Sequence, residues 1–287
     1  MPLARPLART GALLAALAPT GCRGPSGPKV TLRYQPPAGA AYQYALEQAM
    51  ALRLEGTRPG AARSAELTMH VYYTQAVTGP TAGGIAATVT YDSLRFVPAG
   101  YAPALDRMRG LTSSVVYDDR GQVVSARFTT LGDAASPLLE RIGTSVLATA
   151  FPLPDQPVGV GDSWRSDDAR PGDALGVPIK ARMRFTVKEI RAAAADTVVL
   201  VGVEGSFPRD PVTVTQTSPE GVPVERVVRV TGRLTGERLL SVAKGVPLRA
   251  SIAGVLTVLV SGGLSGAEET TLSQQSTLEL LGTTGRR

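Results

Sequence analysis

The chain has 287 residues, of which 43% are hydrophobic and 19% charged, and its formal net charge is +6. Its basic residues are spread out and only 5% of its residues are aromatic, so it lacks the dense Lys/Arg block and the stacking platforms typical of nucleic-acid-binding proteins. A lone cysteine cannot form an internal disulfide, and the length allows one large β domain or two smaller ones held together by an apolar core.

The first residues predict export from the cytoplasm. Arg5 and Arg9 form a basic start, and an apolar run over 11–18 follows them. An apolar run of this length covers about 12 Å as a helix, far less than a bilayer requires. The pattern is therefore typical of a bacterial signal peptide at 1–21 rather than of a membrane span, and its removal would lower the net charge to +4.

Cys22, the only cysteine, resembles the acylated cysteine of a lipoprotein precursor. Pro19 stands where the lipoprotein pattern usually has leucine, so secretion without a lipid, or an incorrect start, stays open as an alternative. We expect Cys22 to be acylated and residues 22–29 to form a tether. The predicted location is the periplasmic side of the bacterial cell envelope. The outer membrane is favoured, because Arg23 stands where an aspartate is associated with inner-membrane retention in some bacteria.

The body of the chain predicts antiparallel β structure. Apolar and polar residues alternate over 42–54, and the same period of two recurs over 67–73 and 85–91. Residues 115–124 read as a hairpin in which Gly121 closes the turn. Later strands are expected at 178–190, 197–204, 224–235, 237–243, 246–260 and 268–281. The predicted fold class is mainly β, with curved antiparallel sheets arranged as a sandwich or a half-barrel.

One or two packed helices are expected beside the sheets. Ser136-Pro137 is a good helix start, and apolar residues recur at helical spacing through 136–150, while a shorter helix is expected at 102–109. A stretch rich in Gly, Pro and Asp ends at Gly176, and within it Gly161-Asp162 is expected to form a turn and Trp164 to begin a strand. It separates two β-rich halves, 30–157 and 158–287, either as a domain boundary or as a long loop within one domain.

Several short, different motifs are spread over much of the mature chain: Leu32-Arg33-Tyr34, the strand entry at 39–44, Gly110 before the hairpin at 117–123, and Phe151-Pro152 leading to 160–164. In these motifs the chain resembles a family of uncharacterised bacterial envelope proteins, a domain of unknown function found in predicted lipoproteins. That family has no established activity or binding residues. The resemblance therefore implies fold and location, and no mechanism.

The sequence contains fragments of catalytic and metal-binding motifs, but none of these motifs is complete. Ser163 follows Gly161-Asp162, as in esterases of the GDSL type, but the only histidine, His70, is far upstream and is not part of an Asp-x-x-His block. Ser241-Val242-Ala243-Lys244 matches Ser-x-x-Lys, yet the later motifs of penicillin-binding enzymes do not follow it. Four clustered aspartates fit no calcium-loop spacing: Asp162, Asp167, Asp168 and Asp173. We expect a protein that is not an enzyme and that has no cofactor or metal site.

A basic stripe is the strongest candidate for a binding surface. On the strand expected over 178–190, the residues of one face are Lys180, Arg182, Arg184 and Lys188. Arg229 and Arg233 share one face of a later strand in the same way. The stripe is either the solvated side of an antiparallel sheet or a surface that contacts anionic lipid head groups, where each cation contributes about 1 kcal/mol.

These observations support two hypotheses for function. The first is a non-enzymatic, lipid-anchored envelope protein that encloses a hydrophobic or lipidic ligand between its curved sheet and helices. The second is a structural or assembly lipoprotein that acts through another envelope protein. Both hypotheses place the protein at the membrane through acylated Cys22, and neither involves nucleic acid. A hydrolase is disfavoured because no pair of base and nucleophile can be named.

Overall fold

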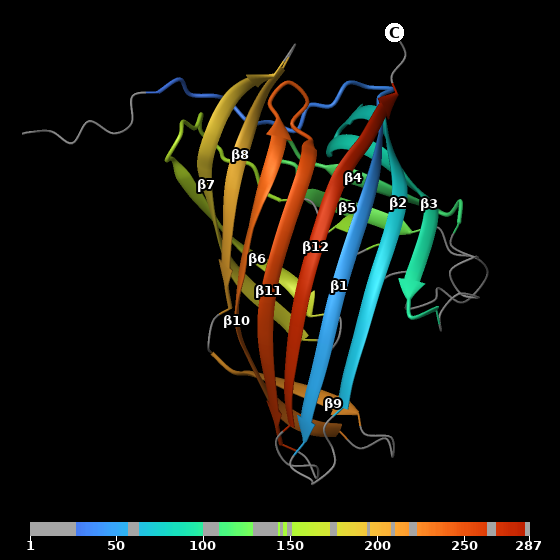
Figure 1. The fold of residues 1–287 in the computed structure, drawn as a ribbon, viewed down its shortest axis with the longest axis vertical. Helices are drawn as coiled ribbons and strands as arrows, with labels where there is room; N and C mark the ends of the chain where they lie inside the picture. Colours follow the sequence, from blue (N-terminus) through green and yellow to red (C-terminus); the bar gives the residue numbers. More distant parts are fainter. Residues whose placement is uncertain are drawn as a thin grey trace, which may run out of the picture.

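A single sheet forms the framework of the molecule. The computed structural model describes residues 27–56, 63–99, 109–128, 143, 146–147, 151–172, 177–193, 196–207, 210–217, 223–262 and 268–284. The strands are β1 (Ala41–Gly56), β2 (Arg63–Thr81), β3 (Gly84–Val97), β4 (Thr112–Tyr117), β5 (Val123–Phe128), β6 (Ser163–Gly172), β7 (Val177–Ala193), β8 (Asp196–Ser206), β9 (Val212–Thr217), β10 (Pro223–Ser241), β11 (Pro247–Ser261) and β12 (Glu268–Thr284). Their pairings in this sheet are antiparallel, which confirms the mainly β prediction (Figure 1).

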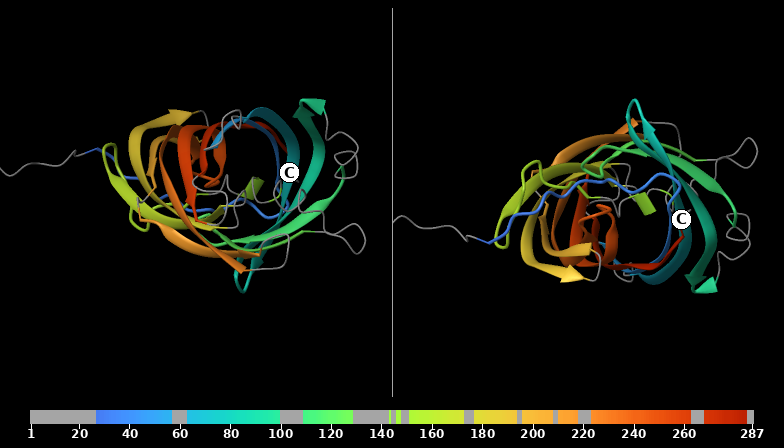
Figure 2. Two further views of the ribbon diagram at one scale, coloured as in Figure 1. Left: turned by 90° about the horizontal axis from the view of Figure 1, so that it is seen from below. Right: turned by 90° about the horizontal axis from the view of Figure 1, so that it is seen from above.

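The order of the strands is β5-β4-β3-β2-β1-β12-β11-β10-β8-β7-β6, and β9 pairs with β10 outside this path. The first five strands thus form one half of the sheet, and the pairing of β1 with β12 joins it to the other half. The edge strands β5 and β6 lie on the same side of the molecule, because the sheet curls round on itself (Figures 1 and 2). The described strands therefore form one curled sheet, as in the predicted half-barrel, and not a two-sheet sandwich.

Residues 27–40, the segment before β1, close the wide end of the curled sheet, and we call them the closing segment. Its hydrogen bonds reach three distant parts of the chain: Val30 bridges to Val158, Tyr34 N donates to Asp119 O at 2.8 Å, and Gln35 N donates to Lys244 O at 3.2 Å. Figure 2 shows this segment crossing the opening when the molecule is viewed from above. The opposite end of the sheet is narrow and is formed by the tips of the long strands (Figure 1).

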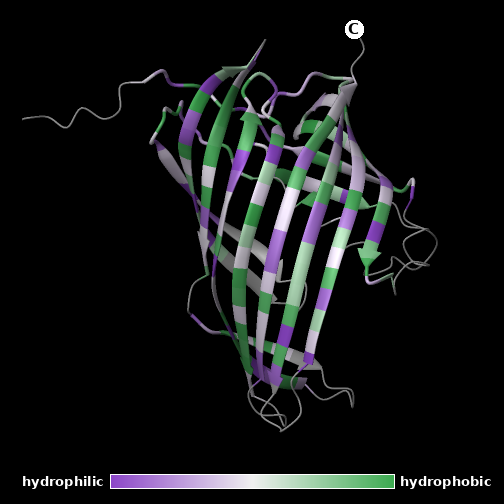
Figure 3. Cartoon of the chain, viewed as in Figure 1, coloured by the Kyte–Doolittle hydropathy of each residue, from purple (hydrophilic) through white to green (hydrophobic). Residues whose placement is uncertain are grey.

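The main apolar core lies at the wide end, on the inner face of the sheet. Its fully buried side chains come from both halves of the sheet and from the closing segment, and they include Leu32, Leu46, Val89, Val199 and Leu240. Along strands such as β1, apolar and polar residues alternate, as Figure 3 shows, because successive side chains point to opposite faces. A second, smaller cluster, Val228, Val230 and Val258, lies far along the strands toward the narrow end.

One predicted strand boundary was wrong. The strands expected at 224–235 and 237–243 are one strand, β10, because Gly236 continues the ladder between Ile252 of β11 and Val203 of β8. Within the stretch rich in Gly, Pro and Asp, the strand expected to begin at Trp164 is present as β6. Strand β9 was not expected at all.

Little of the predicted helices falls on the described residues. Gly143, Val146 and Leu147 are helical and belong to the helix expected at 136–150, and Val146 is buried in the main core. The rest of that helix, and residues 102–108 of the shorter one, lie outside the described residues. In the described part of the chain, no helix has the length and hydrophobicity needed to cross a membrane.

Candidate functional site

The inner face of the sheet carries a strip of large apolar side chains that belong to neither core cluster. We call this set the inner strip: Met50, Leu52 and Leu54 on β1, Ile252 and Leu256 on β11, and Leu272 on β12. All six side chains are only partly buried. They lie on the same face as buried Leu46 and Leu278, because residues two apart on a strand share a face.

The strand register brings the inner strip together. Leu272 of β12 stands directly opposite Leu52 on one side and Leu256 on the other, so three leucines form a continuous row across three strands. On β10 the row continues to Gly232, where an added Cβ would overlap the Val255 carbonyl and the Cα and side chain of Leu256. The glycine thus allows β10 to approach β11 closely beside Leu256.

Uncharged polar residues lie among the inner-strip residues that are nearest to the main core, and Ile252 of the strip stands opposite one of them, Ser276. On the same face, Gln48 pairs with Ser276, and Gln274 lies opposite Met50. Such groups can exchange hydrogen bonds with an ester, hydroxyl or carboxyl group. The inner face therefore offers an apolar surface with a few uncharged polar groups toward the main core, which suits an amphiphilic molecule.

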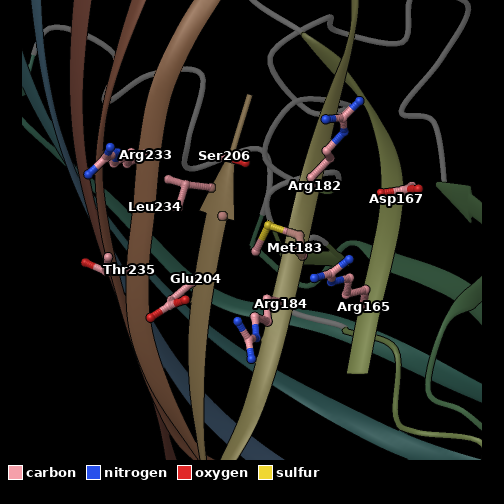
Figure 4. Close-up of a pocket in the computed structure, with 11 residues that line it drawn as sticks. Arg165, Asp167, Arg182, Met183, Arg184, Glu204, Ser206, Arg233, Leu234 and Thr235 are labelled. Atoms are coloured by element: carbon pink, nitrogen blue, oxygen red, sulfur yellow. The ribbon is translucent and has the colours of Figure 1, made fainter. Parts of the chain in front are cut away.

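A charged groove of about 800 Å³ lies across β6, β7, β8 and β10; its charged residues are on the opposite, outer face of the sheet, and the inner-face residues Met183, Gly205 and Leu234 complete its lining. Its charged residues, which we call the outer basic groove, are Arg165, Arg182, Arg184 and Arg233 together with Asp167 and Glu204. Figure 4 shows how these side chains are distributed over neighbouring strands. Ser206 and Thr235 add hydroxyl groups to the lining.

The strand register sets the charge pattern of this groove. Arg165 of β6 stands directly opposite Arg184 of β7, and Arg184 in turn stands opposite Glu204 of β8. One row along, Asp167 stands opposite Arg182. Within the described part of the chain, no ion pair joins any of the four guanidinium groups to a carboxylate.

The predicted basic stripe is only partly reproduced in this groove. Arg182 and Arg184 line it, whereas Lys188 lies beside it and forms an ion pair with Glu237, with 2.8 Å between Nζ and Oε1. The side chain of Lys180 and the whole of Cys22 lie outside the described residues. Arg165 was missed, although its alternation with Trp164 and Ser166 is the signal of an exposed strand position.

The serine and histidine residues of the rejected catalytic motifs take part in local structure or lie exposed. Ser241 Oγ donates a hydrogen bond to Asp196, and the backbone N–H of Lys244 donates to Ser241 Oγ at 3.2 Å, so this pair shapes the turn between β10 and β11. Ser163 is an exposed residue at the start of β6. His70 lies on the outer face, with its Nδ1 3.4 Å from Glu47 Oε2.

The clustered aspartates do not converge in the structure. Asp162 accepts a hydrogen bond from the Gly159 N–H and pairs with Lys29, whose Nζ lies 3.2 Å away. Asp167 lines the outer basic groove, and the side chain of Asp168 and all of Asp173 lie outside the described residues. No group of three or more His, Cys, Asp or Glu residues suited to a metal ion occurs in the described ranges.

The chain is thus an antiparallel β protein whose single curled sheet carries an inner strip and an outer basic groove. No protein-family model and no curated protein sequence matches it. A solved structure with a similar fold is that of lipovitellin, which was determined to describe lipid–protein interactions in lipovitellin. The two share 14% sequence identity with a TM-score of 0.56, over 88% of this chain and 26% of the lipovitellin chain.

At this identity the similarity shows the fold alone, and this chain spans about a quarter of the length of the lipovitellin chain. The resemblance to a family of envelope lipoproteins stays a prediction.

Proposed function

We propose that this protein is a non-enzymatic, lipid-binding protein of the bacterial cell envelope that holds the acyl part of an amphiphile on the inner strip. The observation that carries the proposal is the row Leu52–Leu272–Leu256 on the inner face, partly exposed and outside both apolar clusters. The fold similarity to lipovitellin, a protein with described lipid–protein interactions, supports the same class of ligand. Anchoring through acylated Cys22 on the periplasmic side, with the outer membrane favoured, belongs to the proposal and rests on the sequence pattern.

The chemistry of the inner strip fits an acyl chain. Each methylene that leaves water for an apolar surface contributes about 0.8 kcal/mol, so a fatty acyl chain gains enough free energy to offset its loss of freedom. Full burial of a leucine side chain contributes about 1.5–3 kcal/mol, and a ligand that covers the three leucines of the row completes their burial. Gln48, Gln274 and Ser276 lie where the polar part of such a ligand would face the main core.

The test compares two neighbouring residues of β11. Leu256 faces the inner side, whereas Val255 faces the outer side and is 51% exposed. We expect Leu256→Gln to weaken binding of the fluorescent fatty acid cis-parinaric acid about tenfold, because one lost leucine contact is worth at least about 1.4 kcal/mol. Val255→Gln is the matched control and should bind the probe like the wild type.

The native ligand can be identified from protein purified from its own source. Full-length protein purified from its own envelope should carry a lipid that solvent extracts without breaking a covalent bond, and mass spectrometry would identify it. An empty protein, or equal loss of probe binding in both variants, would contradict the proposal. That outcome would favour the alternative of a structural or assembly lipoprotein that acts through a protein partner.

A further inference from the structure

We infer that the outer basic groove is a binding site for phosphate-type oxyanions. Its charged residues lie on the face of the sheet opposite the inner strip, so this site is separate from the proposed lipid-binding surface and does not depend on it. The groove holds four guanidinium groups and two carboxylates, which leaves two positive charges in excess. An anion that enters the groove would offset this excess.

The strongest evidence is a pair of like charges. In an antiparallel sheet, side chains directly opposite each other have Cβ atoms about 4.5–5.5 Å apart, and like charges there destabilise the sheet. Arg165 and Arg184 occupy such a position. Within the described residues, neither arginine has an ion pair that would relieve the repulsion.

A neighbouring cation on the same face does have a carboxylate partner, unlike the arginines of the groove. Lys188 lies two strand rows from Arg184 on the same face of β7, and there a carboxylate is in place, with Glu237 Oε1 2.8 Å from the ammonium group. In the groove, Glu204 is opposite Arg184 and Asp167 is opposite Arg182, yet neither carboxylate pairs with the arginines. The guanidinium groups thus remain available to a ligand.

The donor set selects the ligand chemistry. A guanidinium group presents its N–H donors in a planar fork that matches two oxygens of a phosphate group, and several arginines around one phosphate can engage different oxygens. Ser206 and Thr235 supply hydroxyl donors in the same lining. Asp167 and Glu204 can accept hydrogen bonds from hydroxyl or ammonium groups attached to the phosphate. The volume of about 800 Å³ leaves room for such a substituent.

Two kinds of ligand carry such a phosphate group: an anionic phospholipid, in its head group, and a soluble phosphate ester. Thermal unfolding of the full chain in inorganic phosphate, compared with chloride at equal ionic strength, tests for the site itself. We expect phosphate to raise the wild-type melting temperature in a saturable way. In Arg165→Gln/Arg184→Gln this increase should disappear, while the melting temperature in chloride should not fall, because the variant also loses a repulsion.

Two further variants separate the site from general effects of charge and salt. Arg229→Gln removes one charge from the same face of β10 outside the groove, and its response to phosphate should match the wild type. Arg184→Lys keeps the charge without the planar fork and should weaken phosphate binding about tenfold or more. If phosphate stabilises all variants equally, it acts as an excluded salt and the proposal is overturned.

Vesicles then distinguish the two kinds of ligand. Co-sedimentation that is stronger with phosphatidylcholine vesicles containing phosphatidylglycerol than with phosphatidylcholine vesicles alone, with this difference lost in the double variant, would identify a lipid head group as the ligand. Saturable phosphate binding without such a difference would identify a soluble phosphate ester. Because Leu256→Gln alters only the inner face, it should leave both readouts unchanged, so failure of this site and failure of the inner strip are distinguishable.

Discussion

Buried tyrosines form a hydrogen-bonded group within the main core. Gln75 connects two of them: its Nε2 donates to Tyr34 Oη at 2.6 Å, and Tyr117 Oη donates to its Oε1 at 3.5 Å. Tyr44 Oη donates to the Pro247 carbonyl at 3.2 Å. Burial is the main cause that raises the pKa of the Tyr34, Tyr44 and Tyr117 phenols above their ordinary value. These phenols therefore stay protonated in the folded state under conditions that would ionise them in the unfolded chain.

The raised pKa values predict a loss of stability in alkali. A phenol whose pKa is higher in the folded state stabilises the fold fully below its unfolded pKa of about 10, and this contribution is lost as the pH rises further. Each such tyrosine lowers the free energy of unfolding by about 1.4 kcal/mol per pH unit above that point. Urea unfolding from pH 8 to 11.5 should show the decline. Tyr117→Phe should make the free energy of unfolding fall less steeply with pH, by about 1.4 kcal/mol per pH unit.

The positions of single residues depend on strand pairing that the sequence pattern does not determine. Alternation identified Arg182 and Arg184 as surface residues of one strand, but a period of two says nothing about which strand lies beside them. Arg165 follows Trp164, where a strand was expected to begin, but only the pairing of β6 with β7 places it opposite Arg184. Likewise, the row Leu52–Leu272–Leu256 depends on β1 meeting β12, two strands at opposite ends of the chain.

At the scale of elements, local patterns predicted the hairpin of β4 and β5 well. Asp118 Oδ1 accepts hydrogen bonds from the backbone N–H groups of Arg120 and Gln122, and Gly121 has a φ of 74°, as a glycine-closed turn requires. Glycine was misleading inside β10. There Gly236 brings the strand close to β11, since an added Cβ would overlap the backbone of Ser251, and the strand continues. Composition alone does not separate these two uses of glycine.

The turn between β10 and β11 makes a testable contact with the closing segment. Gly245 has a φ of 65°, and an added Cβ would overlap the Arg33 carbonyl. Gly39 has a φ of 79° with nothing within 4 Å of the same position. Gly39→Ala should therefore cost only the backbone strain, about 1–2 kcal/mol, and Gly245→Ala about 1–3 kcal/mol more.

Urea unfolding measures both costs, and limited proteolysis near Arg33 reports whether the closing segment is released. Cleavage there should increase in Gly245→Ala and not in Gly39→Ala. Equal destabilisation by the two variants would show that the close approach to Arg33 has no energetic role.

At the scale of the whole molecule, the position of β12 decides how the chain is held together. The boundary near residue 157, expected from composition, falls between β5 and β6, the two edge strands of the sheet. The halves on either side of it are joined elsewhere, where β1 and β12 pair along their full lengths from Ala41–Thr284 to Gly56–Glu268. The main core also takes buried side chains from both halves. These connections favour a single cooperative unit over two independent ones.

Cooperativity can be measured because each half has its own spectroscopic probe. Trp164, the only tryptophan, stacks on Phe185 with 5.3 Å between ring centroids, and its fluorescence reports on the half that contains β6 and β7. The near-ultraviolet dichroism of the buried tyrosines, such as Tyr44 and Tyr73 with centroids 5.3 Å apart, reports on the other half. We expect both signals to give the same urea midpoint. Val89→Ala, a fully buried position on β3, should lower both midpoints together by the equivalent of about 2 kcal/mol, because a defect in one half destabilises the shared sheet. If the Trp164 midpoint stayed at its wild-type value while the tyrosine midpoint fell, the halves would unfold separately, and the long pairing of β1 with β12 would not couple them.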